Sequence, residues 1–173
     1  GDQLQETVDE FGADGSRVLP VTTDITDVDQ VHQMAEMVER EFGSVDILIN
    51  NAGRSIRRSV RYSYDRFHDF ERTMQLNYFA CVRLTMNLLP SMTARKSGHV
   101  INVSSAAGYS ASSALPAYNA TKFAVLGLSE AFYDAMERDE PQLAALHACD
   151  PPGRIARDTR DRFGLFLIGW LGG

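Results

Sequence analysis

VDILIN, residues 45–50, is an almost continuous apolar run followed by an Asn-Ala-Gly turn sequence. A short apolar run bounded by turn residues is typical of a central parallel strand, because such a strand is buried on both faces. Residues 27–42, which precede it, carry apolar side chains at every third or fourth position, and Gly43 follows them. This spacing predicts an amphipathic helix ending at the glycine, and Thr26 with Asp29 fits a capping pattern at its start.

Further elements are expected on both sides of this unit. Residues 17–24, RVLPVTTD, predict a short buried strand before the helix. After the Asn-Ala-Gly turn, a long apolar helix is expected from about residue 67 to residue 96. Pro90 should bend this helix or mark its last turns, and Gly98 should end it.

The alternation of strands and helices continues to about residue 138. Residues 99–105, HVINVSS, predict a strand that brings Ser105 to its carboxyl end. A helix is expected over residues 117–138. Its apolar side would be formed by Phe123, Leu126, Ala131, Phe132 and Met136. This order is typical of the α/β class, so we expect a single domain over residues 1–173 with a three-layer, doubly wound parallel sheet.

The composition argues against several classes of protein. Hydrophobic residues make up 44% and charged residues 23% of the chain, as in globular proteins, and a net charge of −6 argues against nucleic acid as a partner. Cys81 and Cys149 lie far apart and the four histidines are scattered, so neither a disulfide framework nor a metal site is expected. No run of residues approaches the ~20 apolar residues of a transmembrane segment. The sequence does not open with a secretory signal, so we expect a cytoplasmic protein.

The strongest chemical signal is the pair Tyr118 and Lys122, four residues apart in an expected helix. Side chains at this spacing share one helical face, and a nearby ammonium stabilises a phenolate, so that a tyrosine can act as a general acid and base near neutral pH. Ser105, thirteen residues before Tyr118, could offer its hydroxyl to the same substrate oxygen. For the spacing alone, an ordinary surface pairing is the alternative.

Several motifs in a fixed order make the sequence similar to the short-chain dehydrogenase/reductase family. They are N-N-A-G at residues 50–53, Asn77 in the long helix, Ser105, and Y-x-x-x-K at residues 118–122. The sequence NNAGRSIRRS, followed by SYDRFHDFERTMQLNYF, is more narrowly similar to the bacterial fatty acyl-CoA reductases of that family. The resemblance implies a Rossmann-like fold and hydride transfer between a nicotinamide cofactor, NADPH or else NADH, and a carbonyl carbon. The implied substrate is a fatty acyl-CoA or long-chain aldehyde, and an unrelated ketone or secondary alcohol is the alternative.

The resemblance also implies a catalytic role for each motif residue. Tyr118 would protonate the substrate oxygen, and Ser105 would hydrogen-bond to the same oxygen. Lys122 would stabilise the phenolate and bind the nicotinamide ribose. Asn77 would hold a local distortion of its helix together with a water that relays protons to Lys122.

Cofactor contacts are expected where the parallel strands end, because ligands of open α/β sheets bind beyond the carboxyl ends of the strands. The resemblance implies that Asp24 and Ile25 contact the adenine ring. It implies that Asn51, Ala52 and Gly53 let the dinucleotide approach the backbone. Tyr118 and Lys122 would complete the cofactor site.

Four arginines occur between residues 54 and 61 of this acidic protein. Guanidinium groups bind phosphates and carboxylates in a bidentate manner. We therefore expect Arg57 and Arg58 to hold the phosphates of an acyl-CoA substrate or the 2′-phosphate of the cofactor. A solvated basic loop is the alternative.

The G-x-x-x-G-x-G turn that holds the pyrophosphate in the family does not occur in residues 1–173. We therefore expect a partial domain that lacks the first β-α-β unit, and a homodimer or homotetramer is implied by the resemblance. A truncated remnant that only oligomerises is the alternative to an active reductase. Either residues 143–152 form a further strand or residues 141–152 mark an internal deletion. The apolar residues 163–170 are expected in the core or at a subunit contact.

Overall fold

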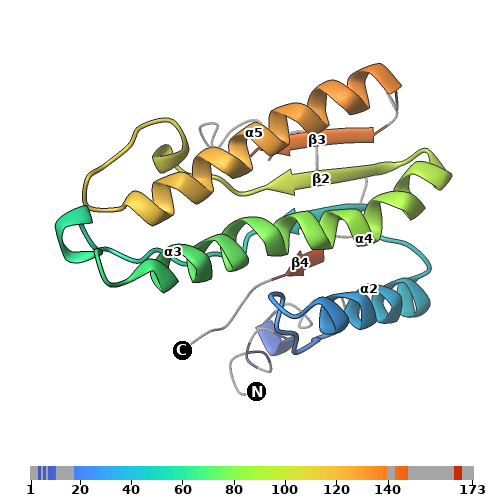
Figure 1. The fold of residues 1–173 in the computed structure, drawn as a ribbon. Helices are drawn as coiled ribbons and strands as arrows, with labels where there is room; N and C mark the ends of the chain where they lie inside the picture. Colours follow the sequence, from blue (N-terminus) through green and yellow to red (C-terminus); the bar gives the residue numbers. More distant parts are fainter. Residues whose placement is uncertain are drawn as a thin grey trace.

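The computed structural model describes residues 4, 6, 8–10, 18–139, 143–147 and 166–168. In this part of the chain the strands form one parallel sheet in the order β3-β2-β1-β4 (Figure 1). Their bounds are β1 Ile47–Asn50, β2 Gly98–Asn102, β3 Leu143–His147 and β4 Phe166–Ile168. Parallel neighbours need crossover connections, and helices supply them here, which confirms the expected α/β class.

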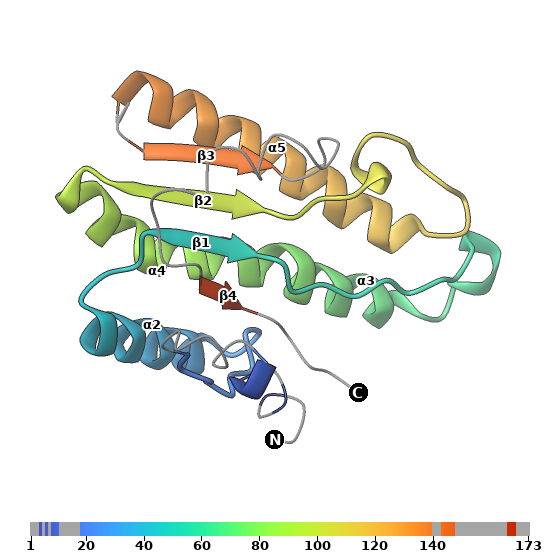
Figure 2. The same cartoon turned by 180° about the vertical axis from the view of Figure 1, so that it is seen from behind.

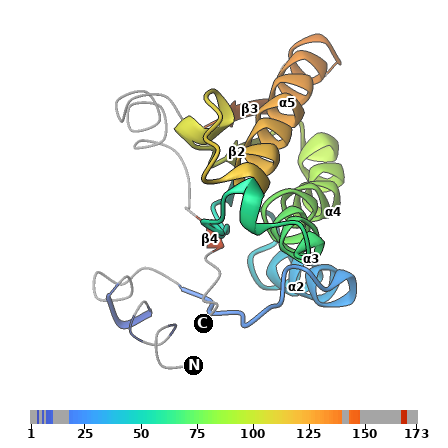
Figure 3. The same ribbon diagram turned by 60° about the vertical axis from the view of Figure 1, so that its left-hand side comes forward.

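Helices α4 Ala80–Arg95 and α5 Pro116–Asp139 lie on one face of this sheet. Figures 1 and 2 view the molecule from opposite sides, and α4 and α5 lie in front of the strands in one view and behind them in the other. Figure 3 shows the same layering from the side. The longer helices are α2 Val28–Phe42, α3 Phe67–Met74, α4 Ala80–Arg95 and α5 Pro116–Asp139; the shorter ones are η1 Val60–Tyr62, η2 Gln75–Phe79 and η3 Ala106–Gly108.

The α2 helix is confirmed, with one correction to its start. Its N-cap is Asp27, whose carboxylate accepts hydrogen bonds from the backbone N–H groups of Asp29 and Gln30. Thr26 does not cap the helix, because its hydroxyl donates to Asp24 Oδ1 at 2.7 Å. At the other end Gly43 adopts a φ of 80°, the left-handed conformation that glycine allows at a helix end.

The main core lies between α2, α4 and the sheet. Burying one such aliphatic side chain contributes about 1.5–3 kcal/mol, so this layer holds the sheet and its helices together. Its buried members include Val31, Met34, Val38, Leu48, Leu84, Leu88, Met92 and Val100.

The expected strand over residues 17–24 is wrong, because residues 18–24 contain no strand. Pro20 has no N–H to donate to a ladder. On the side of β1 that faces away from β2, the paired strand is β4, with Leu48 opposite Phe166. Val21 instead packs its side chain against the core.

Strands β3 and β4 place two segments near the end of the sequence. The strand alternative for residues 143–152 is confirmed over Leu143–His147, which pairs with β2; residues 148–152 lie outside the described residues. Of the apolar residues 163–170, Phe166–Ile168 form β4 within the sheet.

The long helix is confirmed as α3, η2 and α4 in direct succession. Its middle part, η2, is a π-helix containing Asn77, so the helix is distorted at that residue. It ends at Arg95, and its C-cap is Lys96, which takes a left-handed φ of 55°; Gly98 does not end it. Gly98 belongs to β2, where a Cβ atom would lie 2.7 Å from the side chain of Met92.

The α5 helix is confirmed, but its buried face is less apolar than expected. Phe123 and Ala131 are exposed, contrary to the prediction. Much of the buried face packs against polar turns and strand ends, so polar side chains occupy it. Its buried residues are Ala117, Asn119, Thr121, Lys122, Val125, Ser129 and Met136.

A buried polar network joins α4, α5 and the two central strands. The side-chain amide of Asn50 donates to Asn102 Oδ1 at 2.8 Å, and Asn102 donates to Ser129 Oγ at 2.8 Å. The Cys81 thiol also donates to Asn102 Oδ1, at 3.1 Å. Burial raises the pKa of the Cys81 thiol to about 12, although the positive charge of Lys122 acts in the opposite direction.

We therefore expect Cys81 to be inert in the folded protein. At pH 8 a thiol with a pKa near 12 is ionised in about one molecule in 10⁴, and the thiolate is the reactive form. In a Cys149→Ser background, Ellman's reagent should titrate no thiol at pH 8 and one thiol in urea. Complete reaction within minutes without denaturant would contradict this burial.

Candidate active site

The candidate site lies at the carboxyl ends of β1 and β2. The strands are in register there, with Asn50 opposite Asn102. Figure 2 shows that both strands point toward the end of the molecule at which α5 begins. The segment after β1 therefore runs beside the N-terminal part of α5, as expected for the ligand-binding edge of an open α/β sheet.

Lys122 is held under this edge. Its side chain is buried, and Nζ donates to the carbonyl oxygen of Val103 at 2.7 Å, directly after β2. The same Nζ lies 5.8 Å from the centroid of the Tyr118 ring, one turn earlier in α5. The expected sharing of one helical face is therefore present. The ammonium faces the strand end and the tyrosine, and it is shielded from bulk solvent.

Asn77 links three segments of the site. Its Oδ1 accepts from the backbone N–H of Arg54 at 2.8 Å, and its Nδ2 donates to the Arg54 carbonyl at 2.9 Å. Nδ2 also donates to Thr121 Oγ1 at 3.1 Å, and that hydroxyl donates to the Tyr118 carbonyl. Asn77 therefore ties the segment after β1 to the helix that carries Tyr118.

Gly53 lies between these groups. A Cβ atom at this position would come within 3.4 Å of Asn77 Oδ1 and 3.8 Å of Lys122 Nζ. Asn51 and Gly53 are exposed and Ala52 is half-buried, so the backbone between them is accessible. Small residues and accessible backbone at a strand end leave room for a nucleotide.

Ser105 begins the turn that leads from β2 toward α5. It is the N-cap of η3, and its Oγ accepts from the Ala107 N–H at 3.2 Å. Gly108, at the end of η3, lets this turn approach α5, because a Cβ there would lie 2.9 Å from the Lys122 carbonyl oxygen. The structure thus connects the Ser105 turn directly to the turn of α5 that carries Lys122.

Asn119 was not singled out by the sequence, yet it organises the loop between Ser105 and Tyr118. Its buried side chain donates to the carbonyls of Ala107 and Ser110, at 2.9 and 3.1 Å, and accepts from the Ser112 N–H at 3.1 Å. Its position next to Tyr118 is the only signal in the sequence, and the partners are backbone groups that the sequence does not mark.

Replacing Asn119 by alanine should lower the free energy of unfolding by about 1–2 kcal/mol, because three hydrogen bonds are lost while the loop carbonyls can still reach water. The change is measured by urea unfolding. Asn51→Ala is the matched control, since Asn51 is exposed and should cost less than about 0.5 kcal/mol. Equal effects of the two substitutions would contradict the role of Asn119.

The two arginines expected to bind phosphates differ in their surroundings. Arg58 donates to Asp69 Oδ2 at 3.1 Å, so its guanidinium already has an acidic partner. Arg57 is exposed. Their role in substrate binding stays a prediction.

Asp69 is the centre of this ion-pair cluster. Its side chain is 7% exposed and also accepts from Arg66 Nε at 3.0 Å, and His68 Nε2 lies 3.2 Å from Oδ1. The hydrogen bond from Arg66 lowers the pKa of the Asp69 carboxyl; burial opposes this, and the charges of Arg66 and His68 and the hydrogen bond from Arg58 reinforce it. The cluster fastens the segment after Gly53 to the start of α3.

The lowered pKa of Asp69 predicts a pH-dependent contribution to stability. A carboxyl with a lowered folded-state pKa stabilises the protein above its unfolded pKa, near 3.9, and loses this contribution as the pH falls through the folded value. Urea midpoints should therefore fall less steeply below pH 4 in Asp69→Asn than in the unmodified protein. Asp65→Asn, at an exposed carboxylate nearby, is the control, and equal slopes for Asp69→Asn and the unmodified protein would contradict the assignment.

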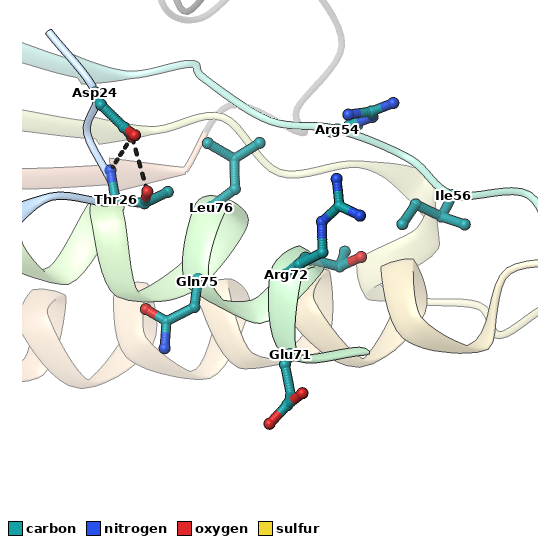
Figure 4. Close-up of a pocket in the computed structure, with 9 residues that line it drawn as sticks. Asp24, Thr26, Arg54, Ile56, Glu71, Arg72, Gln75 and Leu76 are labelled. Atoms are coloured by element: carbon teal, nitrogen blue, oxygen red, sulfur yellow. Dashed lines mark hydrogen bonds between the residues drawn. The ribbon is translucent and has the colours of Figure 1, made fainter. Parts of the chain in front are cut away.

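A cavity of about 400 Å³ opens beside the site, between α3, η2 and the segments around residues 24 and 55 (Figure 4). Asp24, one of the expected cofactor contacts, lines it, whereas the Ile25 side chain is buried in the core. The lining residues are Asp24, Thr26, Arg54, Ile56, Glu71, Arg72, Thr73, Gln75 and Leu76.

The described residues contain neither a candidate metal site nor a membrane-spanning helix. No group of three or more His, Cys, Asp or Glu side chains there could hold a metal ion. None of the helices there is both long and apolar enough to cross a membrane.

Comparison with known proteins identifies relatives at two levels. The family model described as short chain dehydrogenase matches residues 1–151. A fatty acyl-CoA reductase of Acinetobacter baylyi is 46% identical over 140 residues, which are 79% of this chain and 45% of that protein. A fatty acyl-CoA reductase of Mycobacterium tuberculosis is 43% identical over 129 residues, 74% of this chain and 44% of that protein. The chain thus spans less than half the length of these relatives.

Solved structures agree with these matches. A short-chain dehydrogenase from Streptomyces avermitilis superposes with a TM-score of 0.72 at 33% identity, covering 82% of this chain and 51% of that one. A short-chain dehydrogenase/reductase from Burkholderia phymatum in complex with NAD gives a TM-score of 0.76 at 28% identity, covering 83% of this chain and 51% of that one. With a family model that matches most of its length and with this sheet order, the chain belongs to the short-chain dehydrogenase/reductase family of Rossmann-fold oxidoreductases.

Proposed function

We propose that this chain provides the catalytic residues of an NADPH-dependent reductase acting on a fatty acyl-CoA or a long-chain aldehyde. The observation that carries the proposal is the buried Lys122, with its Nζ on the Val103 carbonyl and 5.8 Å from the Tyr118 ring. Burying an ammonium is costly unless it is hydrogen-bonded. An ammonium kept beside a phenol ring at a strand end supports proton transfer by that tyrosine, because it favours the negative charge that the phenol gains when it gives up its proton.

The residues at the strand ends fit a dinucleotide. The accessible backbone at Asn51, Ala52 and Gly53 lies next to Asn77 and Lys122, and Asp24 lines the adjoining cavity. Asp24 and the Ile25 backbone would contact the adenine, and Lys122 and Tyr118 the nicotinamide ribose. A bound nicotinamide would supply the hydride.

In this proposal each side chain acts on the substrate oxygen or supports a group that does. Tyr118 donates its proton to the oxygen that gains negative charge, and Ser105 hydrogen-bonds to the same oxygen. Lys122 stabilises the tyrosinate left behind. Asn77 fixes the Arg54 backbone and Thr121, and thereby the spacing between the cofactor edge and α5.

The substrate class rests on the two relatives named fatty acyl-CoA reductases. A ketone or secondary alcohol unrelated to fatty acids is the second candidate substrate, and NADH is the second candidate cofactor. Purified protein should oxidise NADPH in the presence of palmitoyl-CoA or hexadecanal, followed at 340 nm. Activity confined to short ketones would favour the second candidate, and the ratio of kcat/KM values for NADPH and NADH decides the cofactor.

A non-catalytic protein that only forms oligomers is the other candidate, and exposed apolar side chains favour it. Met86 on α4 and Phe123 and Tyr133 on α5 are about half exposed, and the resemblance implies that these helices pack against a second copy in a homodimer or homotetramer. The molecular mass from light scattering, together with a calorimetric titration with NADPH, separates the candidates. A dimer that shows no saturable binding at millimolar NADPH would reject the reductase.

A further inference from the structure

The cavity beside the site contains two arginines with no acidic partner among the described residues. Arg54 and Arg72 both line it, and neither guanidinium takes part in an ion pair there. Figure 4 shows the Arg72 side chain directed from α3 toward the segment that carries Arg54 and Ile56. Glu71, on the same helix, points the opposite way, so it does not neutralise the pair.

The backbone that carries the arginines is fixed. Asn77 holds both the N–H and the carbonyl of Arg54, at 2.8 and 2.9 Å. Arg72 lies in the last turn of α3, and its carbonyl accepts a hydrogen bond from the backbone N–H of Gln75, the C-cap of that helix. A preorganised backbone reduces the entropy lost when the side chains close on a ligand.

We propose that Arg54 and Arg72 form a binding site for a phosphate group of a nucleotide ligand. Two guanidinium groups offer bidentate hydrogen bonds to phosphate oxygens, and Ile56 and Leu76 supply the apolar walls of the same cavity. This inference rests on the proposed function, because the proposed function is what identifies the ligand as a nucleotide. Both NADPH and an acyl-CoA carry an adenosine with a phosphate on its ribose, so the shared chemistry is a phosphorylated adenosine.

Calorimetry on the full chain tests the proposal with four probes: NADPH, NADH, coenzyme A and inorganic pyrophosphate. Arg54→Ala/Arg72→Ala should weaken the binding of the phosphorylated ligand by about 10- to 100-fold, because charge-assisted contacts are lost at both positions. If the double variant loses affinity for NADPH but not for NADH, the ligand group is the 2′-phosphate of the cofactor. If it loses affinity for coenzyme A while its affinity for NADPH is unchanged, the ligand group is the ribose phosphate of the acyl-CoA substrate.

Two matched variants control for the loss of positive charge. Arg61→Ala removes an exposed arginine of the same segment, which packs on the Tyr62 ring, and should leave every affinity unchanged. Arg57→Ala compares the effect of the Arg54 and Arg72 pair on affinity with that of an arginine that the sequence predicted to bind phosphate. Unchanged binding in the double variant, or an equal loss in Arg61→Ala, would overturn the proposal.

The proposed function can fail separately. A protein that binds pyrophosphate through Arg54 and Arg72 but neither nucleotide would keep the phosphate site and reject the reductase. A protein that reduces its substrate equally well with and without the pair would keep the reductase and reject the site. An unmodified protein that binds none of the four probes would reject both.

Discussion

Replacing Tyr118 by phenylalanine is expected to lower kcat by about 10²- to 10⁴-fold, which is the range that a positioned general acid contributes. The substitution removes the hydroxyl and keeps the ring beside Lys122, so the 5.8 Å contact between Nζ and the ring can persist. Affinity for NADPH should therefore change by less than about threefold. The measurements are kcat from the absorbance of NADPH and the dissociation constant from calorimetry.

Tyr133→Phe is the matched control for this prediction. Tyr133 lies on the same helix, is half exposed, and within the described residues its hydroxyl hydrogen-bonds only to Glu137, at 3.3 Å. Removing that hydroxyl should leave kcat unchanged. If Tyr118→Phe retained normal turnover, the proton would come from another group and the assignment of Tyr118 would be lost.

The parts of the site that the sequence predicted are those set by local spacing. Tyr118 and Lys122 are four residues apart, and any α-helix brings such a pair together. The helix distortion at Asn77 came from the family resemblance, and the π-helix over Gln75–Phe79 confirms it. The strand at residues 47–50 followed from its apolar run, which needs no knowledge of its neighbours.

The parts that the sequence did not predict depend on distant segments. Residues 18–24 are apolar enough for a strand, but β1 pairs with Phe166–Ile168, more than 100 residues further along the chain. Asn119 holds backbone carbonyls, which carry no mark in the sequence. The cavity that Arg54 and Arg72 both line lies between α3, η2 and the segment after β1, and Asn77 of η2 holds the Arg54 backbone of that segment.

Replacing Asn77 by alanine should affect stability and activity together. The substitution removes three hydrogen bonds and leaves the N–H and carbonyl of Arg54 and the Thr121 hydroxyl without this partner. Because the side chains of Asn77 and Thr121 are buried, we expect the free energy of unfolding to fall by about 2–4 kcal/mol. Urea unfolding measures this change in stability. In buffer without urea, where the variant is still folded, kcat should fall at least about tenfold, because the spacing between Gly53 and Lys122 is no longer fixed.

Two further variants, Asn87→Ala and Asn77→Asp, distinguish the loss of the Asn77 hydrogen bonds to Arg54 and Thr121 from the loss of another helical asparagine side chain. Asn87 lies on α4, is half-buried, donates to the Arg83 carbonyl of its own helix and has its Oδ1 3.0 Å from Nδ1 of the exposed His32, so alanine there should cost about 1 kcal/mol. Asn77→Asp keeps an acceptor for the Arg54 N–H but places a second oxygen against the Arg54 carbonyl, so it should be nearly as damaging as alanine. If Asn77→Asp were as stable and active as the unmodified protein, donation by Nδ2 to Arg54 and Thr121 could not be what joins the cofactor edge to α5.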